Sequence, residues 1–175
     1  LQMRPLLLIL LVCIAATEQK CGQAPRNKLS SQSFVSNMTG NAVIGGDQAS
    51  DGTWPWTVSI RIKDWFGGYA KVVGAGTIID STHIVTSYTA IDQPVKPTSF
   101  YIRAGSVNSE SGGTGPLQVR DFFKFQRVDT FTHYGDIAVM ELMHPLTFTD
   151  NIQPICVAGT DEVEVRLGTW AWFNG

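Results

Sequence analysis

Short apolar stretches, each bounded by polar or glycine-containing turns, recur along the middle of the chain. Residues 57–62 alternate between polar and apolar side chains, which is the pattern of a half-buried strand. Two further apolar stretches flank the polar triplet Asp80-Ser81-Thr82 and predict two strands joined by a turn. The chain is therefore expected to form short strands separated by turns, at Thr57–Ile62, Thr77–Ile79, Ile84–Ser87, Phe100–Ser106 and Leu117–Phe125.

The N-terminal residues have a different pattern. A single basic residue, Arg4, precedes an apolar run at 6–16 and a few small residues. This arrangement predicts a secretory signal peptide at 1–17, cleaved near Ala16 or Thr17. The alternative is a membrane anchor, which would need about 20 apolar residues, and this run is about half that length. We therefore expect a secreted, extracellular protein with no membrane span.

Residues 18–42 form a polar, propeptide-like leader that is rich in Ser, Asn and Gln and shows no periodicity. The leader contains one glycosylation sequon, Asn37-Met38-Thr39. Such a triplet is a modification site in an exposed secreted segment and a chance occurrence elsewhere. Glycosylation of Asn37 is thus an expectation that depends on secretion.

The amino-acid composition favours a folded globular domain over a disordered or nucleic-acid-binding chain. Hydrophobic residues make up 43% and charged residues 16% of the 175 residues, which favours a packed core over disorder. The formal net charge is −2 and no basic stripe is present, so nucleic acid is not an expected partner. The histidines lack metal-ligand spacing, and the Gly/Ser loop at 109–115 has no lysine for phosphate binding. We expect neither a metal nor a cofactor.

The chain has three cysteines, Cys13, Cys21 and Cys156. Cys13 lies in the predicted signal peptide, which leaves two cysteines in the mature chain. Two cysteines suit one disulfide bond in an oxidising compartment.

Four motifs follow one another along the chain: Val43-Ile44-Gly45-Gly46 with Trp54-Pro55-Trp56, the stretch Gly74 to Ala90, Tyr134 to Leu142, and Asn151 to Val157. In this order they resemble the motifs of the chymotrypsin/trypsin family of serine proteases. The resemblance implies an all-β fold in which 43–175 form a trypsin-like domain: the first of two six-stranded antiparallel barrels and the start of the connection to the second. The second barrel, which carries the nucleophilic serine in this family, is expected to be absent from this chain. Because the chain starts at Leu1 rather than Met and ends inside a family motif, we expect a fragment.

The resemblance also assigns residues to the catalytic positions. The triad aspartate falls on Asp136, whereas the triad histidine falls on Thr89, and the cysteines that brace that histidine fall on Gly74 and Ala90. Threonine has no basic form near neutral pH, so it cannot replace histidine as general base. Without the histidine, Asp136 is expected to cap nearby backbone amides or to bond to the Thr89 hydroxyl.

Two further assignments follow from the resemblance. Val43 would be the mature N-terminus after cleavage, although Ala42 before it is not the Arg or Lys of trypsin-like activation. Cys21 and Cys156 would form a disulfide that keeps the leader attached after such a cleavage. A bond that closes so long a loop is worth roughly 4–5 kcal/mol in the chain-entropy model.

The three histidines offer little to replace the missing base. His83 starts a predicted strand and is expected to be half-buried, and His144 precedes a proline in an expected surface turn. His133 lies three residues before Asp136, in a loop above the expected cleft. It is the one alternative source of an imidazole for the site.

Two functions are compatible with the sequence. In the first, the protein is a catalytically inactive serine protease homologue that acts by binding proteins, namely proteases, their inhibitors or their substrates. In the second, it is a fragment of an active serine endopeptidase whose sequence is incomplete or faulty. The joint changes at Gly74, Thr89 and Ala90 favour the first, because a single-base error would alter one position rather than three.

Overall fold

The structure, a computed structural model, describes a short leader segment and most of the chain after residue 48. The predicted signal peptide, Asn37, Val43 and the chain after residue 159 lie outside the described residues, and their roles remain predictions. The described ranges are 21–24, 49–63, 69–108, 111–125, 129 and 131–159.

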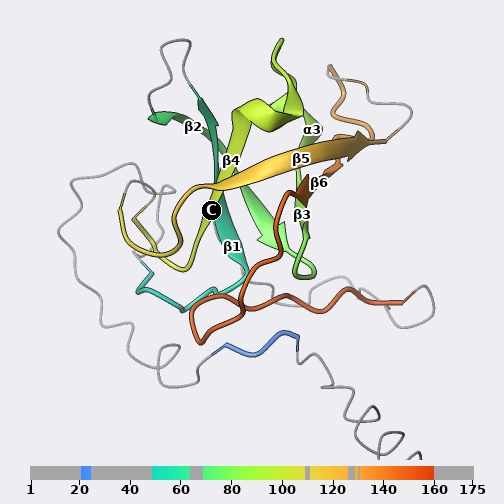
Figure 1. The fold of residues 1–175 in the computed structure, drawn as a ribbon. Helices are drawn as coiled ribbons and strands as arrows, with labels where there is room; N and C mark the ends of the chain where they lie inside the picture. The colour runs from blue at the N-terminus through green and yellow to red at the C-terminus, as the bar shows by residue number, and fades with distance from the viewer. Residues whose placement is uncertain are drawn as a thin grey trace, which may run out of the picture.

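In this part of the chain, antiparallel strands form a closed barrel in the order β1-β2-β3-β6-β5-β4 (Figure 1). β1 bonds to both β2 and β4 and thereby closes the sheet. The predicted all-β fold with a trypsin-like antiparallel barrel is confirmed. The strands are β1 Thr57–Lys63, β2 Tyr69–Ile78, β3 His83–Thr86, β4 Phe100–Ala104, β5 Leu117–Lys124 and β6 Ala138–Leu142.

Alternate side chains of these strands fill the barrel. Val58 and Ile60 of β1 are buried, whereas Thr57 and Ser59 beside them are half-buried, as the alternation predicted. β4 and β6 bury every second residue in the same way. Closing the sheet removes the apolar face of each strand from water, which stabilises the fold. The fully buried side chains include Ile78, Ile84, Phe100, Ile102, Val119 and Met140.

β2 differs most from its prediction. The strand was expected at Thr77–Ile79, yet it begins at Tyr69 and pairs with β1 over most of its length. Glycines weaken the strand signal in this stretch, and pairing with β1 outweighs that weak propensity. One of these glycines is needed for packing, because a Cβ at Gly76 would lie 2.6 Å from Ile84 Cγ2.

The described helices are short. The 3-10 helix η1 (Pro97–Ser99) leads into β4, and the α-helix α3 (Tyr88–Ile91) follows β3. Among the described residues, no helix is long and apolar enough to cross a membrane.

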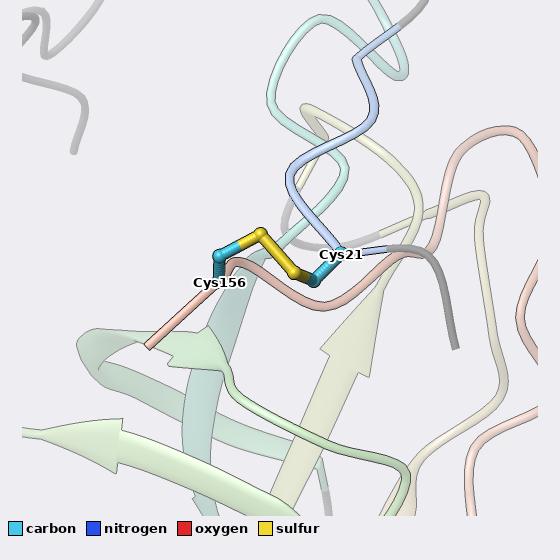
Figure 2. The surroundings of a disulfide bond; sticks show 2 residues. All are labelled: Cys21 and Cys156. Carbon is cyan, nitrogen blue, oxygen red and sulfur yellow. A yellow bond between two sulfur atoms is a disulfide. The ribbon is translucent and has the colours of Figure 1, made fainter. Parts of the chain in front are cut away.

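The leader is attached to the barrel by a disulfide bond between Cys21 and Cys156 (Figure 2). The two Cα atoms are 4.9 Å apart, and the residues are separated by 135 positions in the sequence. Beside the bond, the Gly22 amide donates to the Pro154 carbonyl at 2.8 Å. The predicted pairing is confirmed, and a covalent loop of this length stabilises the fold by about 5 kcal/mol in the chain-entropy model.

Candidate active site

α3 positions Thr89 at the end of β3. Ser87 caps this helix, because its side-chain oxygen accepts a hydrogen bond from the Ala90 amide at 3.3 Å. Ile91, the last helical residue, is fully buried. The cap and the buried isoleucine fix the single turn at both ends. The sequence pattern predicted strand up to Ser87 and missed the helix, since four residues are too few to show a helical period.

Asp136 reaches the same corner from a distant part of the sequence. It precedes β6, and β6 pairs with β3 so that Ala138 lies opposite Thr86. Because the pairing is antiparallel, the segment before Ala138 meets the segment after Thr86. The side chain of Asp136 is 15% exposed. The strand register therefore brings together the two residues that the sequence assigned to the catalytic positions.

Both carboxylate oxygens of Asp136 accept hydrogen bonds from Thr89. The Thr89 amide donates to Oδ1 and the Thr89 hydroxyl donates to Oδ2, each at 2.8 Å. The pKa of Asp136 lies below its ordinary value, first because the Thr89 amide stabilises the charged form. Burial opposes this decrease, whereas the Thr89 hydroxyl and the nearby His133 add to it. Asp136 is thus an ionised cap for Thr89 at neutral pH.

The Thr89–Asp136 pair holds two segments together and offers no strong base. In the Ser-His-Asp arrangement, an imidazole lies between the nucleophile and the aspartate and accepts the proton. Here the Thr89 hydroxyl donates directly to the carboxylate. A carboxylate whose pKa is lowered is also a weak proton acceptor near neutral pH. The arrangement is suited to a structural link between α3 and the segment before β6.

Gly74 and Ala90, the positions assigned to the bracing cysteines, face each other. A Cβ built on Gly74 would lie 2.8 Å from the Cβ of Ala90. The Cβ atoms of a disulfide are usually about 3.5–4.5 Å apart, so two cysteines would need the backbones to separate by about 1 Å. The glycine lets α3 approach β2 more closely than a disulfide would.

His133 lies at the rim of this corner. Its Nδ1 is 3.8 Å from Asp136 Oδ2, which is too long for a hydrogen bond. The side chain is 70% exposed, and a φ of 56° places the backbone in the left-handed region. Histidine is enriched there relative to most other residues, but no sequence pattern at this position predicts the conformation. His133 is an exposed neighbour of Asp136, not a partner that separates it from Thr89.

The other two histidines lie elsewhere. His83 starts β3 and pairs with Asp80, with Nδ1 2.8 Å from Oδ2. Its side chain is 35% exposed, which agrees with the expected half-buried position. His144 is exposed just after β6, as expected. Within the described ranges, no group of three His, Cys, Asp or Glu side chains is placed to hold a metal ion.

Known proteins are similar to most of this chain. The sequence model of the trypsin family matches residues 43–173. The chain is 31% identical over 150 residues to the proclotting enzyme of Tachypleus tridentatus, covering 81% of this chain and 39% of that protein. It is also 31% identical over 130 residues to the ovochymase of Halocynthia roretzi, covering 73% of this chain and 8% of that protein. The chain thus spans less than half the length of these relatives. Together with the closed barrel and the position of Asp136, the matches show that the chain belongs to the trypsin family of serine proteases.

Proposed function

We propose that this protein is a secreted trypsin-family homologue that does not cleave peptides and acts by binding proteins, namely proteases, their inhibitors or their substrates. The observation that carries the proposal is Thr89 at the histidine position, bonded through its amide and its hydroxyl to Asp136. A serine hydroxyl becomes a good nucleophile only when a neighbouring base takes its proton. A threonine bonded to an ionised carboxylate does not fill that role.

The close approach of Gly74 and Ala90 supports the same function. In the family these positions hold the disulfide that braces the histidine, and here a glycine and an alanine pack together instead. Loss of the brace and loss of the base at one corner are consistent with a site that no longer needs a precisely held imidazole.

Secretion is part of the proposal. The apolar run in 1–17 supports a signal peptide, and the Cys21–Cys156 bond supports an oxidising compartment, where disulfides persist. We propose residues 18–42 as a leader that carries a glycan at Asn37. Cleavage before Val43 would leave this leader attached through Cys21.

The alternative is a fragment of an active serine endopeptidase. Family membership favours it, as does Asp136 at the triad position, and a matched relative is called a proclotting enzyme. The match covers only 39% of that relative, so the remaining chain would have to supply the serine. Activity would also require a histidine at residue 89 in the native protein.

The test uses native protein purified from its source. A fluorophosphonate probe, which labels activated serines covalently, is applied beside active trypsin as a positive control, and residue 89 is read by mass spectrometry in the same sample. We expect threonine at residue 89 and no labelling. Labelling of the native protein, or histidine at residue 89, would overturn the proposal.

A further inference from the structure

The Gly/Ser loop at 109–115 has no part in the candidate active site and lies between β4 and β5 (Figure 1). The structure describes this loop from Ser111 onward, where the sequence reads Ser-Gly-Gly-Thr-Gly. The side chain of Ser111 is exposed, and none of the described residues forms a hydrogen bond with its hydroxyl. The loop therefore presents a serine oxygen that an enzyme can reach.

Hydrogen bonds around Arg103 fix the backbone of this loop. Arg103 Nε donates to the Thr114 carbonyl and Arg103 Nη2 donates to the Gly112 carbonyl, each at 3.3 Å. The Ser111 amide donates to Asn108 Oδ1 at 3.2 Å. The backbone of Ser111 is thus held by its neighbours, whereas its hydroxyl takes no part in holding the loop.

The two glycines after Ser111 have a structural reason of their own. Gly112 and Gly113 have φ values of 76° and 61°, in the left-handed region that favours glycine. A Cβ at Gly113 would also clash with the Ala104 carbonyl oxygen. The loop therefore needs these glycines with or without a modification. Nothing in its packing requires the Ser111 hydroxyl, and that group is the feature for which a function is sought.

Both carboxylates and a guanidinium lie at this loop. Asp51 Oδ1 accepts a hydrogen bond from the Val107 amide at 2.6 Å, and Glu110 directly precedes Ser111 in the sequence. The loop itself, residues 105–115, contains no lysine or arginine, and Arg103 reaches it from β4. Ser111 is thus a serine with an acidic residue before it and a glycine after it.

We propose that Ser111 carries an O-linked xylose, the first sugar of a glycosaminoglycan chain. Peptide xylosyltransferases act on a Ser-Gly pair that has an acidic residue beside it. In the transfer, Ser111 Oγ bonds to C1 of the xylose in UDP-xylose, and the bond from C1 to the phosphate oxygen breaks. UDP leaves, and a base of the transferase takes the serine proton. This inference rests on the secretion that we propose above, because the transferase and its donor belong to the secretory pathway.

The test uses the full chain, expressed with its signal peptide in mammalian cells and recovered from the medium. Glycosaminoglycan lyases trim the chain to a short stub, and trypsin cleaves after Arg103 and Arg120 to release residues 104–120. Electron-transfer fragmentation then locates the sugar within this peptide. We expect a stub that begins with a pentose on Ser111. Cells that lack peptide xylosyltransferase should secrete the protein without it.

Ser111→Ala should abolish the modification and leave the circular dichroism spectrum unchanged, because the hydroxyl bonds to no described residue. The matched control is Ser50→Ala, which removes another exposed serine that is followed by aspartate rather than glycine. This variant should be modified like the parent protein. An unmodified Ser111 in secreted protein, or a sugar there that begins with a hexosamine, overturns the inference.

Secretion is read separately, from the presence of the chain in the medium. If the chain is retained in the cells, the proposed secretion fails, and transfer in vitro decides the acceptor site. Purified chain is then incubated with peptide xylosyltransferase and UDP-xylose. Transfer of a pentose to Ser111 supports the site, and a chain that accepts none overturns it. Fluorophosphonate labelling tests the inactive site, so the proposals fail by different readouts.

Discussion

Two aspartates, one at each end of β3, accept hydrogen bonds from different parts of the chain. At one end, Asp80 Oδ1 accepts the amides of Thr82 at 2.7 Å and His83 at 2.8 Å. At the other end, Asp136 accepts the amide and hydroxyl of Thr89, which is 47 positions away in the sequence. Asp80 therefore closes a local turn, whereas Asp136 joins two distant segments.

An aspartate–histidine contact does not by itself make a catalytic site in this protein. The histidine pair occurs at Asp80, where the imidazole Nδ1 lies 2.8 Å from the carboxylate within one turn. Asp136, which the sequence analysis assigns to the catalytic position, accepts from a threonine instead. The same acceptor chemistry serves a turn in one place and the meeting of α3 with the β5–β6 loop in the other. Position in the fold, and not the pair itself, determines what the aspartate can do.

The largest expected effect comes from the strand that connects the two aspartates. Ile84 of β3 is fully buried, so Ile84→Ala leaves a cavity and should lower the free energy of unfolding by about 2–5 kcal/mol. Urea unfolding measures the change. Val85→Ala, on the half-buried face of the same strand, is the control and should lower it less. A loss below about 1 kcal/mol for Ile84→Ala would contradict the role of β3 as the common support.

A smaller effect is expected from removing one hydroxyl at each aspartate. Thr89→Val keeps the volume and deletes the bond to Asp136, and it should lower the free energy of unfolding by about 1–2 kcal/mol. Thr82→Val deletes the matching bond to Asp80 and should lower it by less. The reason is solvent: Asp80 is 45% exposed and Asp136 is 15% exposed, so water replaces the lost bond more readily at Asp80. Equal losses would mean that the long-range link has no special weight.

The smallest expected effect is in the pH dependence of stability. Burial raises the pKa of Asp80, but hydrogen bonds from Thr82 and His83 outweigh it, so Asp80, like Asp136, titrates below the ordinary value of 3.8. A carboxyl group whose pKa is lowered by folding stabilises the folded state at pH values above its unfolded-state pKa of 3.8. This stabilisation is lost as the pH falls below 3.8 and through the lower pKa of the folded state.

Asp136→Asn should therefore flatten the decline of stability below pH 3.8, as measured by urea unfolding at a series of pH values. Asp80→Asn is the matched variant and should flatten it less, because its carboxylate is more exposed. A variant at Asp136 with an unchanged pH profile would show that the Thr89 bonds do not favour the charged form.

Much of the barrel could be predicted from the sequence, because strand alternation is a local signal. The predicted starts at Thr57, Phe100 and Leu117 are those of β1, β4 and β5. The N-terminal part of β2 could not be predicted from strand alternation, because this glycine-containing stretch becomes a strand by pairing with β1. Closure into a barrel was an implication of the family resemblance.

Some contacts of the candidate site could likewise be predicted from the sequence, and others could not. Motif order located Asp136 and Thr89, and the expected bond from the Thr89 hydroxyl is present. The bond from the Thr89 amide depends on α3, a single turn that is too short to leave a periodic pattern. The left-handed backbone of His133 depends on the β5–β6 loop and had no signal in the sequence. The role of Asp136 and Thr89 in catalysis or its loss remains a prediction.

The Cys21–Cys156 bond also sets an order of events during synthesis. The partner of Cys21 is made 135 residues later, after every strand of the described barrel. At roughly 5–20 residues per second, the leader thiol waits on the order of 10 seconds before its partner exists. During this interval the thiol is open to mispairing with other nascent chains. Formation of the bond thus reports that the ribosome has passed β6 of the described barrel and that the leader has met the segment after β6.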